Sequence, residues 1–259
     1  MRFVDLTVPI TSRRVPGLSD LFNSIMSAQI QYVDHKGTLP MATAVFGCKP
    51  EDLPNGLGWA HEVVTMTTHI GTHIDAPYHY GPMSQGKPSM TADQIPLDWC
   101  YADGVVLDVR HLLPRARIEI KDLEEALAKI PYVLKPYDVV LVRTGWDRYL
   151  GTPQYVSDYP GMTRDSTLWL VEHGVRVIGI DTLGFDRPFN VMAEEFKNTG
   201  NPEVIWESHY AGTTRPYLHI EKLANLGHLP PTGFKLCCFP IPVEGASAGW
   251  VRAVALLDS

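Results

Sequence analysis

Short apolar runs rich in β-branched residues recur along this chain and alternate with helical patterns after residue 100. Runs of this kind are typical of strands buried on both faces of a sheet. Between two of them, Leu123, Ala126, Leu127 and Ile130 follow the i, i+3, i+4, i+7 spacing of one helix face. The alternation predicts an α/β domain. The predicted strands are Phe3–Val8, Val105–Val109, Val139–Arg143, Val175–Ile180, Phe234–Phe239 and Val251–Leu257.

Helix ends are indicated by capping residues and glycines. Asp122 is the predicted cap of the helix that contains Leu123, and Thr163 the predicted cap of a second helix. Residues Val15–Pro54 carry mixed signals, and we expect a flexible or partner-contacting region there. The other predicted helices are Arg164–His173 followed by Gly174, Val191–Asn198 before Gly200, and a short one over Ile220–Leu226 that ends at Gly227.

Charge and composition exclude several classes of protein. The net charge of −7 over 259 residues makes nucleic acid an unsuitable partner. No run of about 18 apolar residues is present, which predicts no membrane partner and no transmembrane helix. The first residues lack the pattern of a signal peptide, and the four cysteines lack CxxC spacing. We therefore expect free thiols and a cytoplasmic location.

Four side chains of metal-binding type stand at odd-numbered positions within eleven residues: His69, His73, Asp75 and His79. Side chains of an extended chain alternate between faces, so these four would share one face. Full extension would separate the Cα atoms of His69 and His73 by ~13 Å, and a bend at the intervening Gly71 would bring their imidazoles together. Neighbouring threonines, a glycine and a proline oppose a helix. The pattern predicts a compact site on a bent strand and the loop after it.

The donor types indicate the kind of ion. Imidazole and carboxylate together suit Zn²⁺, Mn²⁺ or Fe²⁺ better than Ca²⁺ or Mg²⁺. The cluster holds no cysteine, which argues against a closed structural zinc site. A catalytic ion needs about three protein ligands and one open position for water. His69, His73 and Asp75 are the predicted ligands, and His79 is the predicted proton-transfer group. One histidine alone would be read as an ordinary surface or hydrogen-bonded residue.

Other catalytic signatures are missing from the sequence. It has no Gly-x-Ser-x-Gly elbow and no Walker pattern. The segment Gly179–Gly184 lacks the close glycine pair of a dinucleotide-binding turn, and His61-Glu62 lacks the second histidine of a zincin motif. No motif supports a cysteine nucleophile.

Residues 69–79, His-Ile-Gly-Thr-His-Ile-Asp-Ala-Pro-Tyr-His, resemble the HxGTHxDxPxH signature of the cyclase-type metal-dependent hydrolases. This family includes bacterial kynurenine formamidase and isatin hydrolase. The resemblance implies one cyclase-like α/β domain over residues 1–259, with a mixed β-sheet core and flanking helices. It also covers Asp5–Ile10, Arg143–Trp146, Ile178–Thr182, and Pro242–Ala253 with its Ser247 and Arg252.

The resemblance assigns roles to the residues of the signature. His69, His73 and Asp75 match the first metal ligands of the family, and His79 matches its general acid/base. The implied cofactor is a divalent metal, Mn or Zn, with one ion expected and a second left open. Trp59, Phe46 and Tyr78 are candidates for an aromatic pocket, with ordinary core packing as the alternative.

Family members with two ions add a later histidine and a glutamate twelve residues apart. His209 and Glu221 have this separation here, and the resemblance implies that both are metal ligands. His219 competes with His209 for the histidine position. The residues alone would make Glu221 a solvated residue at the start of a short helix.

The resemblance implies an amidohydrolase that acts on C–N bonds other than peptide bonds. A water activated by the metal would cleave an amide bond of a small cyclic or aryl amide, such as isatin or N-formylkynurenine. The segment Arg14–Asp20 lacks the tryptophan by which formamidase members contact substrate, and Tyr210–Pro216 is polar where those members are rich in leucine. An isatin-like substrate therefore fits at least as well.

Two other functions remain open from the sequence. One is a lyase or cyclising enzyme on the same metal site, and the other is a non-catalytic metal-binding protein. The expected partners are a small-molecule substrate and further copies of the chain, as a homodimer or homotetramer. Neighbouring subunits would then complete the pocket through the Val15–Pro54 region.

Overall fold

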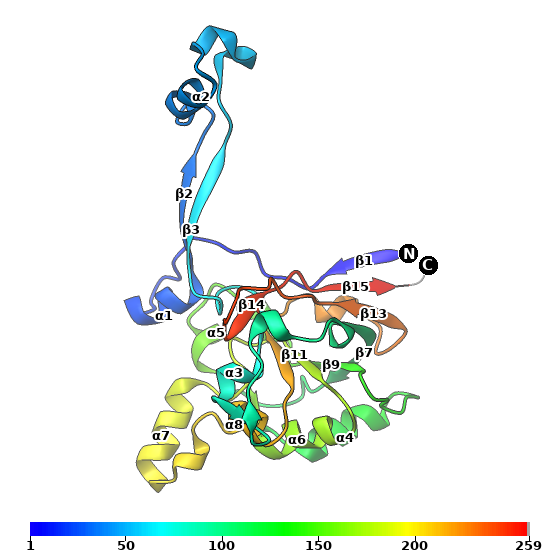
Figure 1. Cartoon of the computed structure of the whole chain (residues 1–259). Coiled ribbons are helices and arrows are strands. Elements are labelled where there is room, and N and C mark those ends of the chain that lie inside the picture. The colour runs from blue at the N-terminus through cyan, green and yellow to red at the C-terminus, as the bar shows by residue number, and fades with distance from the viewer. Residues whose placement is uncertain (258–259) are drawn as a thin grey trace.

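The computed structural model describes residues 1–257, and a mixed nine-stranded sheet forms its centre (Figure 1). The strand order is β1-β15-β13-β7-β9-β11-β12-β4-β14. These strands are β1 (Arg2–Asp5), β4 (His73–Asp75), β7 (Tyr101–Asp108), β9 (Val139–Arg143), β11 (Val177–Ile180), β12 (Leu218–Glu221), β13 (Phe234–Cys237), β14 (Ala248–Trp250) and β15 (Val254–Leu257). The α/β fold with a mixed sheet and flanking helices is confirmed.

The four central strands, β7, β9, β11 and β12, run parallel, and the strands at both edges are antiparallel to their neighbours. Parallel strands are covered on both faces, which is why β9 and β11 read as continuous apolar runs. Val139–Val142 and Val177–Ile180 are buried throughout. Each of the predicted strands is present, with ends that shift by a few residues and with β9 at its predicted bounds.

Helices cover one face of the central strands (Figure 1). Leu123 of α4, Leu170 of α6 and Ala211 of α8 are buried there against Val140 and Ile178. The helices are α1 (Asp20–Met26), α2 (Leu39–Phe46), α3 (Pro77–Tyr80), α4 (Ile120–Ala128), α5 (Gln154–Ser157), α6 (Arg164–Glu172), α7 (Phe189–Thr199) and α8 (Glu207–Thr214). Two short strand pairs, β5 (Met83–Ser84) with β6 (Lys87–Pro88) and β8 (Arg117–Ile118) with β10 (Gly161–Met162), lie outside the main sheet.

Most predicted helix ends are confirmed. Thr163 caps α6 and accepts the backbone N–H of Ser166, and Gly200 ends α7 in the left-handed conformation. The predicted cap of α4, Asp122, was wrong by one turn. Glu119 holds the cap position, and Asp122, three residues later, accepts its backbone N–H at 2.8 Å.

The predicted helix over Ile220–Leu226 is wrong. Its first residues belong to β12, which pairs with β11 and β4 in the middle of the sheet, and only a single 3-10 turn follows at Leu226–His228. Strand pairing on both sides satisfies the backbone of β12, so tertiary context overrides the local helical pattern. Because Glu221 belongs to β12 and not to a helix, it lies in the sheet and is buried.

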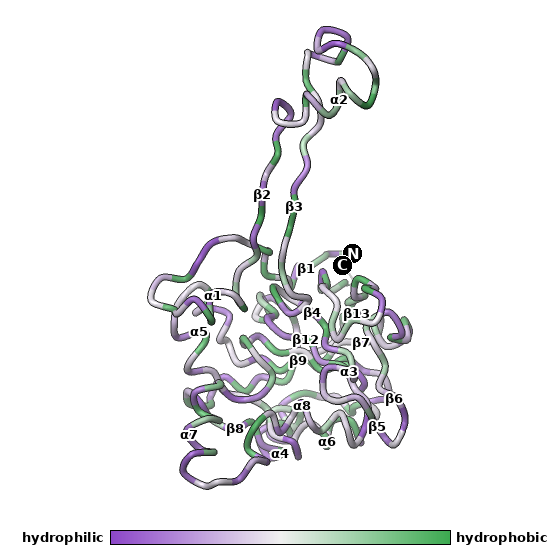
Figure 2. The backbone as a smooth tube through the Cα atoms, turned by 60° about the vertical axis from the view of Figure 1, so that its left-hand side comes forward, coloured by the Kyte–Doolittle hydropathy of each residue, from purple (hydrophilic) through white to green (hydrophobic). Residues whose placement is uncertain are grey.

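Residues 29–65 form an arm that projects away from the body (Figure 2). Its two strands, β2 (Gln29–Val33) and β3 (His61–Thr65), pair antiparallel, and α2 lies at its tip (Figure 1). The region Val15–Pro54, left without assigned elements by the sequence, thus contains α1, β2 and α2. Within residues 1–257, no helix has the length and apolar character needed to cross a membrane.

Candidate metal centre

Strand β4 carries the centre of the signature. It lies between β12 and β14, antiparallel to both. Because side chains alternate along a strand, Ile74 enters the core while His73 and Asp75 project together to the other face. The His73 Nδ1 atom lies 3.0 Å from the carbonyl oxygen of Gly71, which leaves Nε2 directed at Asp75.

His69 reaches the same point from the turn before β4. Gly71 has a φ of 71°, a left-handed conformation that favours glycine, so the predicted bend is confirmed. Thr72 fixes the turn because its hydroxyl donates to the Lys222 carbonyl at 2.6 Å and accepts the Val8 N–H at 2.9 Å. His69 Nδ1 consequently lies 2.9 Å from Asp75 Oδ1.

His79 lies on a helical turn, whereas the sequence predicted a loop after the bent strand and no helix. Pro77 starts this turn, α3, at the first helical position, where its missing N–H costs nothing. The turn places His79 four residues after Asp75, with Nε2 at 3.7 Å from Asp75 Oδ2. The rings of His79 and His69 lie 4.2 Å apart. The predicted proximity holds, but a helix turn produces it.

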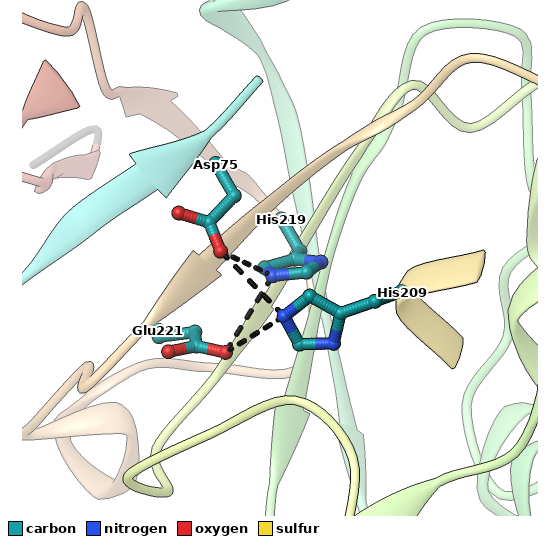
Figure 3. Close-up of side chains that lie close together, drawn as sticks. All are labelled: Asp75, His209, His219 and Glu221. Atoms are coloured by element: carbon teal, nitrogen blue, oxygen red, sulfur yellow. Dashed lines mark hydrogen bonds and ion pairs between the residues drawn. The ribbon is translucent and has the colours of Figure 1, made fainter. Parts of the chain in front are cut away.

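The later residues approach from β12 and α8 (Figure 3). His219 lies opposite Asp75 in the β12–β4 register, and Glu221 lies opposite His73. His219 Nε2 is 2.8 Å from Asp75 Oδ2, and His209 Nε2, from α8, is 3.8 Å from the same oxygen. Glu221 Oε1 lies 3.8 Å from His209 Nε2 and 3.5 Å from His219 Nε2. Glu221 is buried, not solvated, and both histidines are present at the site.

Two overlapping sets of donors result, and Asp75 belongs to both. One set is His69, His73 and Asp75, and the other is Asp75, His209, His219 and Glu221. Asp75 Oδ1 lies 2.9 Å from His69 Nδ1 and 3.2 Å from His73 Nε2, yet it is aligned for a hydrogen bond with neither. His73 Nε2 and Asp75 Oδ1 are both buried without a hydrogen-bond partner in residues 1–257. Buried polar atoms are rarely left unpaired, and an imidazole and a carboxylate directed at one point fit a divalent cation.

The charges of the site favour cation binding. Burial would raise the pKa of Asp75, but the surrounding histidines hold it well below its usual value. Burial also acts to raise the pKa of Glu221, and the hydrogen bond to His219 with the charge of Lys222 lowers it to about 2. Burial lowers the pKa of His219, whereas Asp75 and Glu221 raise it to about 9. A cation therefore has to displace this proton, so binding should weaken as the pH falls.

The imidazoles are held from behind by a second layer of side chains. Asp186 accepts the backbone N–H of Ser208 at 2.7 Å and contacts His209 Nδ1, which leaves His209 Nε2 facing the centre. The ring of Trp206 stacks on His209, with centroids 5.0 Å apart and an interplanar angle of 16°. Phe185 stacks on His219 at 4.4 Å. Such partners fix the orientation of metal-binding histidines.

A cavity of about 160 Å³ opens onto the centre. Its polar wall comes from the histidines and carboxylates described above, and its apolar wall contains Leu183, Phe189, Met192 and Trp206. The three aromatic residues suggested by sequence proximity do not line it. Phe46 and Trp59 pack edge to face on the arm, with centroids 6.5 Å apart, and Tyr78 is exposed.

Comparison with known proteins shows the family. Residues 4–187 match the family described as Cyclase, putative cyclase. This chain belongs to the cyclase family. An isatin hydrolase from Roseibium aggregatum is 24% identical over 280 residues, which cover 93% of this chain and 97% of that protein. A kynurenine formamidase from Erythrobacter litoralis is 27% identical over 191 residues, 74% of each chain.

Solved structures support the same fold for this cyclase-family chain. Isatin hydrolase A from Labrenzia aggregata, bound to benzyl benzoate, matches with a TM-score of 0.75 at 21% identity. The match covers 100% of this chain and 94% of that one. Isatin hydrolase A from Ralstonia solanacearum also gives a TM-score of 0.75 at 22% identity. The predicted family membership is confirmed.

Sequence reasoning about this cyclase-family chain placed His219 second to His209 and missed Asp186 and Trp206. The alternation of His219 and Glu221 along one strand was the available signal, and it was hidden by the incorrect helix. Asp186 and Trp206 carry no motif. Asp186 reaches His209 by accepting the backbone N–H groups of Ser208 and His209 at the start of α8, and Trp206 is the N-cap residue of that helix. The ligand roles of His69, His73, Asp75, His209 and Glu221 remain predictions.

Replacing Asp186 with asparagine should weaken metal binding without unfolding the protein. The amide of D186N cannot serve as a carboxylate partner for His209 Nδ1, so the imidazole loses its fixed orientation. Loss of such a partner typically lowers metal affinity by about 10–100-fold. Titration of metal-stripped protein by calorimetry measures this change. The exposed Glu203→Gln variant is the matched control, and unchanged affinity in D186N would contradict the prediction.

Proposed function

We propose that this protein is a metal-dependent hydrolase that cleaves a C–N amide bond in a small cyclic or aryl amide. One observation carries the proposal: His73 Nε2 and Asp75 Oδ1 are buried, unpaired and 3.2 Å apart, and Asp75 lines the adjoining cavity. The relatives named isatin hydrolase and kynurenine formamidase support an amide as the substrate. We propose Mn²⁺ or Zn²⁺ as the ion because imidazole and carboxylate donors suit both.

A divalent ion at this site would lower the pKa of a bound water to near 7 and polarise a carbonyl group. The residues of the chain would hold this ion in place. His69 and His73 would hold one side of the centre, His209 and Glu221 the other, and Asp75 stands between them. Its carboxylate is within 4 Å of five histidines, so it fixes their relative positions. We propose His219 as a further member of the second set.

His79 is the proposed proton carrier. Its Nε2 lies 3.7 Å from Asp75 Oδ2, and its ring contacts His69, His209 and Trp206 on the cavity side. Burial lowers its pKa to about 4, although Asp75 acts to raise it. The imidazole is therefore neutral near pH 7 and able to accept a proton from the attacking water. It can then deliver that proton to the leaving nitrogen.

The apolar wall of the cavity favours a flat aromatic substrate. Trp206 presents a ring beside His79, with centroids 5.7 Å apart, and Phe189 lies 6.3 Å from Trp206. Aromatic rings prefer offset or tilted packing at such separations, so this wall suits the aryl part of an anilide. Isatin and N-formylkynurenine both place an amide nitrogen on a benzene ring, and both are proposed test substrates.

The decisive experiment combines metal analysis with a substrate panel. The purified protein, the same protein after chelator treatment, and the chelated protein with Mn²⁺ or Zn²⁺ restored are incubated with isatin, N-formylkynurenine and related anilides. We expect activity that follows metal content. The total product mass should exceed the substrate mass by one water, with isotopically labelled water incorporated into the new carboxylate.

Other outcomes point to the other functions. Conversion without a gain of water would indicate a lyase or cyclising enzyme at the same centre. Stoichiometric metal with no turnover of any amide or ester would indicate a metal-binding protein. Either result would overturn the hydrolase proposal.

Replacing Trp206 with leucine should raise KM for aryl amides by about 5-fold, since loss of one aromatic contact costs roughly 1 kcal/mol. KM for a small aliphatic formamide should change little. Trp206 also stacks on His209, so metal content is measured in the same samples. Phe196→Leu is the control, because Phe196 is a partly exposed aromatic residue outside the cavity. Equal changes in KM for both substrate types would contradict the proposed role.

We also propose the cytoplasm as the location of the protein. All four cysteines, Cys48, Cys100, Cys237 and Cys238, are free, as expected, which suits a reducing compartment.

A further inference from the structure

Two tyrosines, Tyr155 and Tyr159, belong to one apolar cluster beside the candidate metal centre. The cluster also contains Trp146, Val156 and Leu183, and it leaves the two tyrosines 0% and 1% exposed. Tyr155 lies in α5, and Tyr159 follows soon after that helix ends. Of the two, only Tyr159 lines the cavity at the metal centre. The tyrosines therefore share their chemistry and burial but differ in their access to the cavity.

The hydroxyl of Tyr159 has no partner inside the protein. It makes no hydrogen bond within residues 1–257, and burial raises its pKa well above the ordinary value of about 10. The hydroxyl therefore keeps its proton near pH 7 and remains a hydrogen-bond donor. Buried polar groups are rarely left unpaired, and one at the wall of a cavity is suited to an atom of a ligand.

The room for this hydroxyl is provided by Gly184, which also lines the cavity. A Cβ atom at position 184 would lie 2.9 Å from Tyr159 Oη and 3.7 Å from Cζ, the ring carbon that carries the hydroxyl. The oxygen end of the tyrosine is thus directed at Gly184, and a methyl group there would displace it. The same point lies 3.8 Å from Glu221 Oε1. The hydroxyl therefore borders the second donor set.

The segment that carries Tyr159 is fixed on both sides. Before it, Asp158 accepts the Arg115 backbone N–H at 2.7 Å, and the two side chains pair at 2.6 Å. After it, the Met162 N–H donates to the Phe185 carbonyl at 2.9 Å, next to Gly184. These contacts hold the hydroxyl in one place relative to the centre. A donor that stabilises a transition state needs this preorganisation.

We propose that Tyr159 Oη donates a hydrogen bond to the carbonyl oxygen of the amide that is cleaved. This inference rests on the proposed hydrolase function and adds a second catalytic residue to His79. Attack of water makes the carbonyl carbon tetrahedral and moves negative charge onto its oxygen, which a donor already in place stabilises. Tyr159 keeps its own proton throughout, so the proton of the attacking water still passes through His79.

The surroundings of Tyr159 favour the carbonyl oxygen as its partner. The two cationic side chains that line the cavity are engaged: Lys222 Nζ donates to the His69 carbonyl at 2.7 Å, and Arg187 pairs with Glu195. The Tyr159 hydroxyl remains available as a donor. In an amide the nitrogen lone pair is delocalised, so the carbonyl oxygen is the atom that accepts a hydrogen bond.

Tyr159→Phe removes only the hydroxyl and tests its role in kinetics. We expect kcat on the best anilide of the panel to fall by about 10²-fold, the usual effect of losing one oxyanion donor. KM and metal content should stay near the wild-type values, because the hydrogen bond strengthens only in the transition state. Tyr155→Phe is the matched control, since it removes a buried, unpaired hydroxyl from the same cluster outside the cavity. Equal losses in both variants would overturn the proposal.

Gly184→Ala gives a test that depends on the position of the hydroxyl. The added methyl group would meet Tyr159 Oη at 2.9 Å, so G184A should displace the oxygen and lower kcat by itself. In the Y159F background the oxygen is absent, and 3.7 Å to the ring is an ordinary contact. The double variant G184A/Y159F should therefore be no slower than Y159F. Additive losses would show that the two residues act separately and would overturn the proposal.

Binding of phenylphosphonate separates this inference from the proposed function. The probe places tetrahedral anionic oxygens on a benzene ring and requires no turnover. Titrated by calorimetry into the Mn²⁺-loaded protein, it should bind Y159F about 10-fold more weakly than the wild type or Y155F. This result in a protein that hydrolyses no amide would retain the donor role and overturn only the hydrolase proposal. Equal Kd values for Y159F and wild type, or no binding to the wild type, would overturn the role of Tyr159.

Discussion

Asp75→Asn is expected to remove most of the bound metal and to lower kcat/KM by more than about 10³-fold, since metal assistance supplies several kcal/mol of transition-state stabilisation. Asp75 is common to both donor sets, and its two carboxylate oxygens face histidines on β4, α3, β12 and α8. The asparagine side chain has one neutral acceptor and one donor group. It therefore leaves both sets without their shared charge. Elemental analysis of the purified variant and kcat/KM on the best panel substrate measure the two effects.

The matched control is Asp98→Asn, which makes the same chemical change at an exposed position in a 3-10 turn. It should retain full metal content and activity. If D75N were to keep stoichiometric metal while D98N behaved as wild type, the proposed centre would be in the wrong place. Loss of metal in both variants would indicate a general loss of folding, which circular dichroism identifies.

His79→Gln is expected to retain metal and to lower kcat by about 10²–10⁴-fold, the usual contribution of a positioned acid or base. The substitution keeps a polar side chain beside Asp75 but removes the group that accepts and returns a proton. Metal content near that of the wild type separates this result from the loss of a ligand. The exposed His111→Gln variant is the control and should be fully active. Simultaneous loss of metal in H79Q would make His79 a ligand and would contradict its role as a proton carrier.

The pH profile gives a second readout for His79. Burial lowers its pKa to about 4, so the neutral form that accepts a proton is present above that value and is lost as the pH falls through it. The wild-type rate should therefore show no fall due to His79 between about pH 8 and pH 5. H79Q should be slower at every pH, and its rate should lack the fall near pH 4 that protonation of His79 causes in the wild type. A wild-type limb centred near the ordinary histidine pKa of about 6.5, at constant metal content, would contradict the assignment.

The parts of the fold that depend on local pattern were predictable. Val139–Arg143 is a strand because both of its faces are buried, and Thr163 caps α6 because its hydroxyl meets a free backbone N–H. The signature residues were also identifiable, since His69, His73, Asp75 and His79 lie close together in the chain. Their local conformation was less predictable. Their odd-numbered positions suggested one shared face of an extended chain, whereas only His73 and Asp75 belong to a strand.

The parts that depend on distant pairing were not predictable from pattern. Glu221 lies in a stretch with helical spacing, and only its pairing with β4 and β11 makes it a buried strand residue. Asp186 contacts His209 from a distant segment, with no spacing that would connect the two residues. Trp206 lies three residues before His209, but no motif indicated that its ring stacks on the imidazole. The projection of the arm is not indicated by its residues either, because Gln29–Tyr32 of β2 alternate polar and apolar side chains as a strand of a packed hairpin would.

The pairing of β4 with β12 has a consequence for synthesis and turnover of the protein. The first donor set is translated early, but His209, His219 and Glu221 emerge only after all the central parallel strands except β12 itself have been made. A nascent or truncated chain can therefore present three donors without the remainder. If the proposed ion needs both donor sets, its tight binding would require a chain that has folded through Glu221. Ligand binding that requires the native state also stabilises it in proportion to RT ln(1 + [L]/Kd), so metal supply should set how long each molecule survives proteolysis.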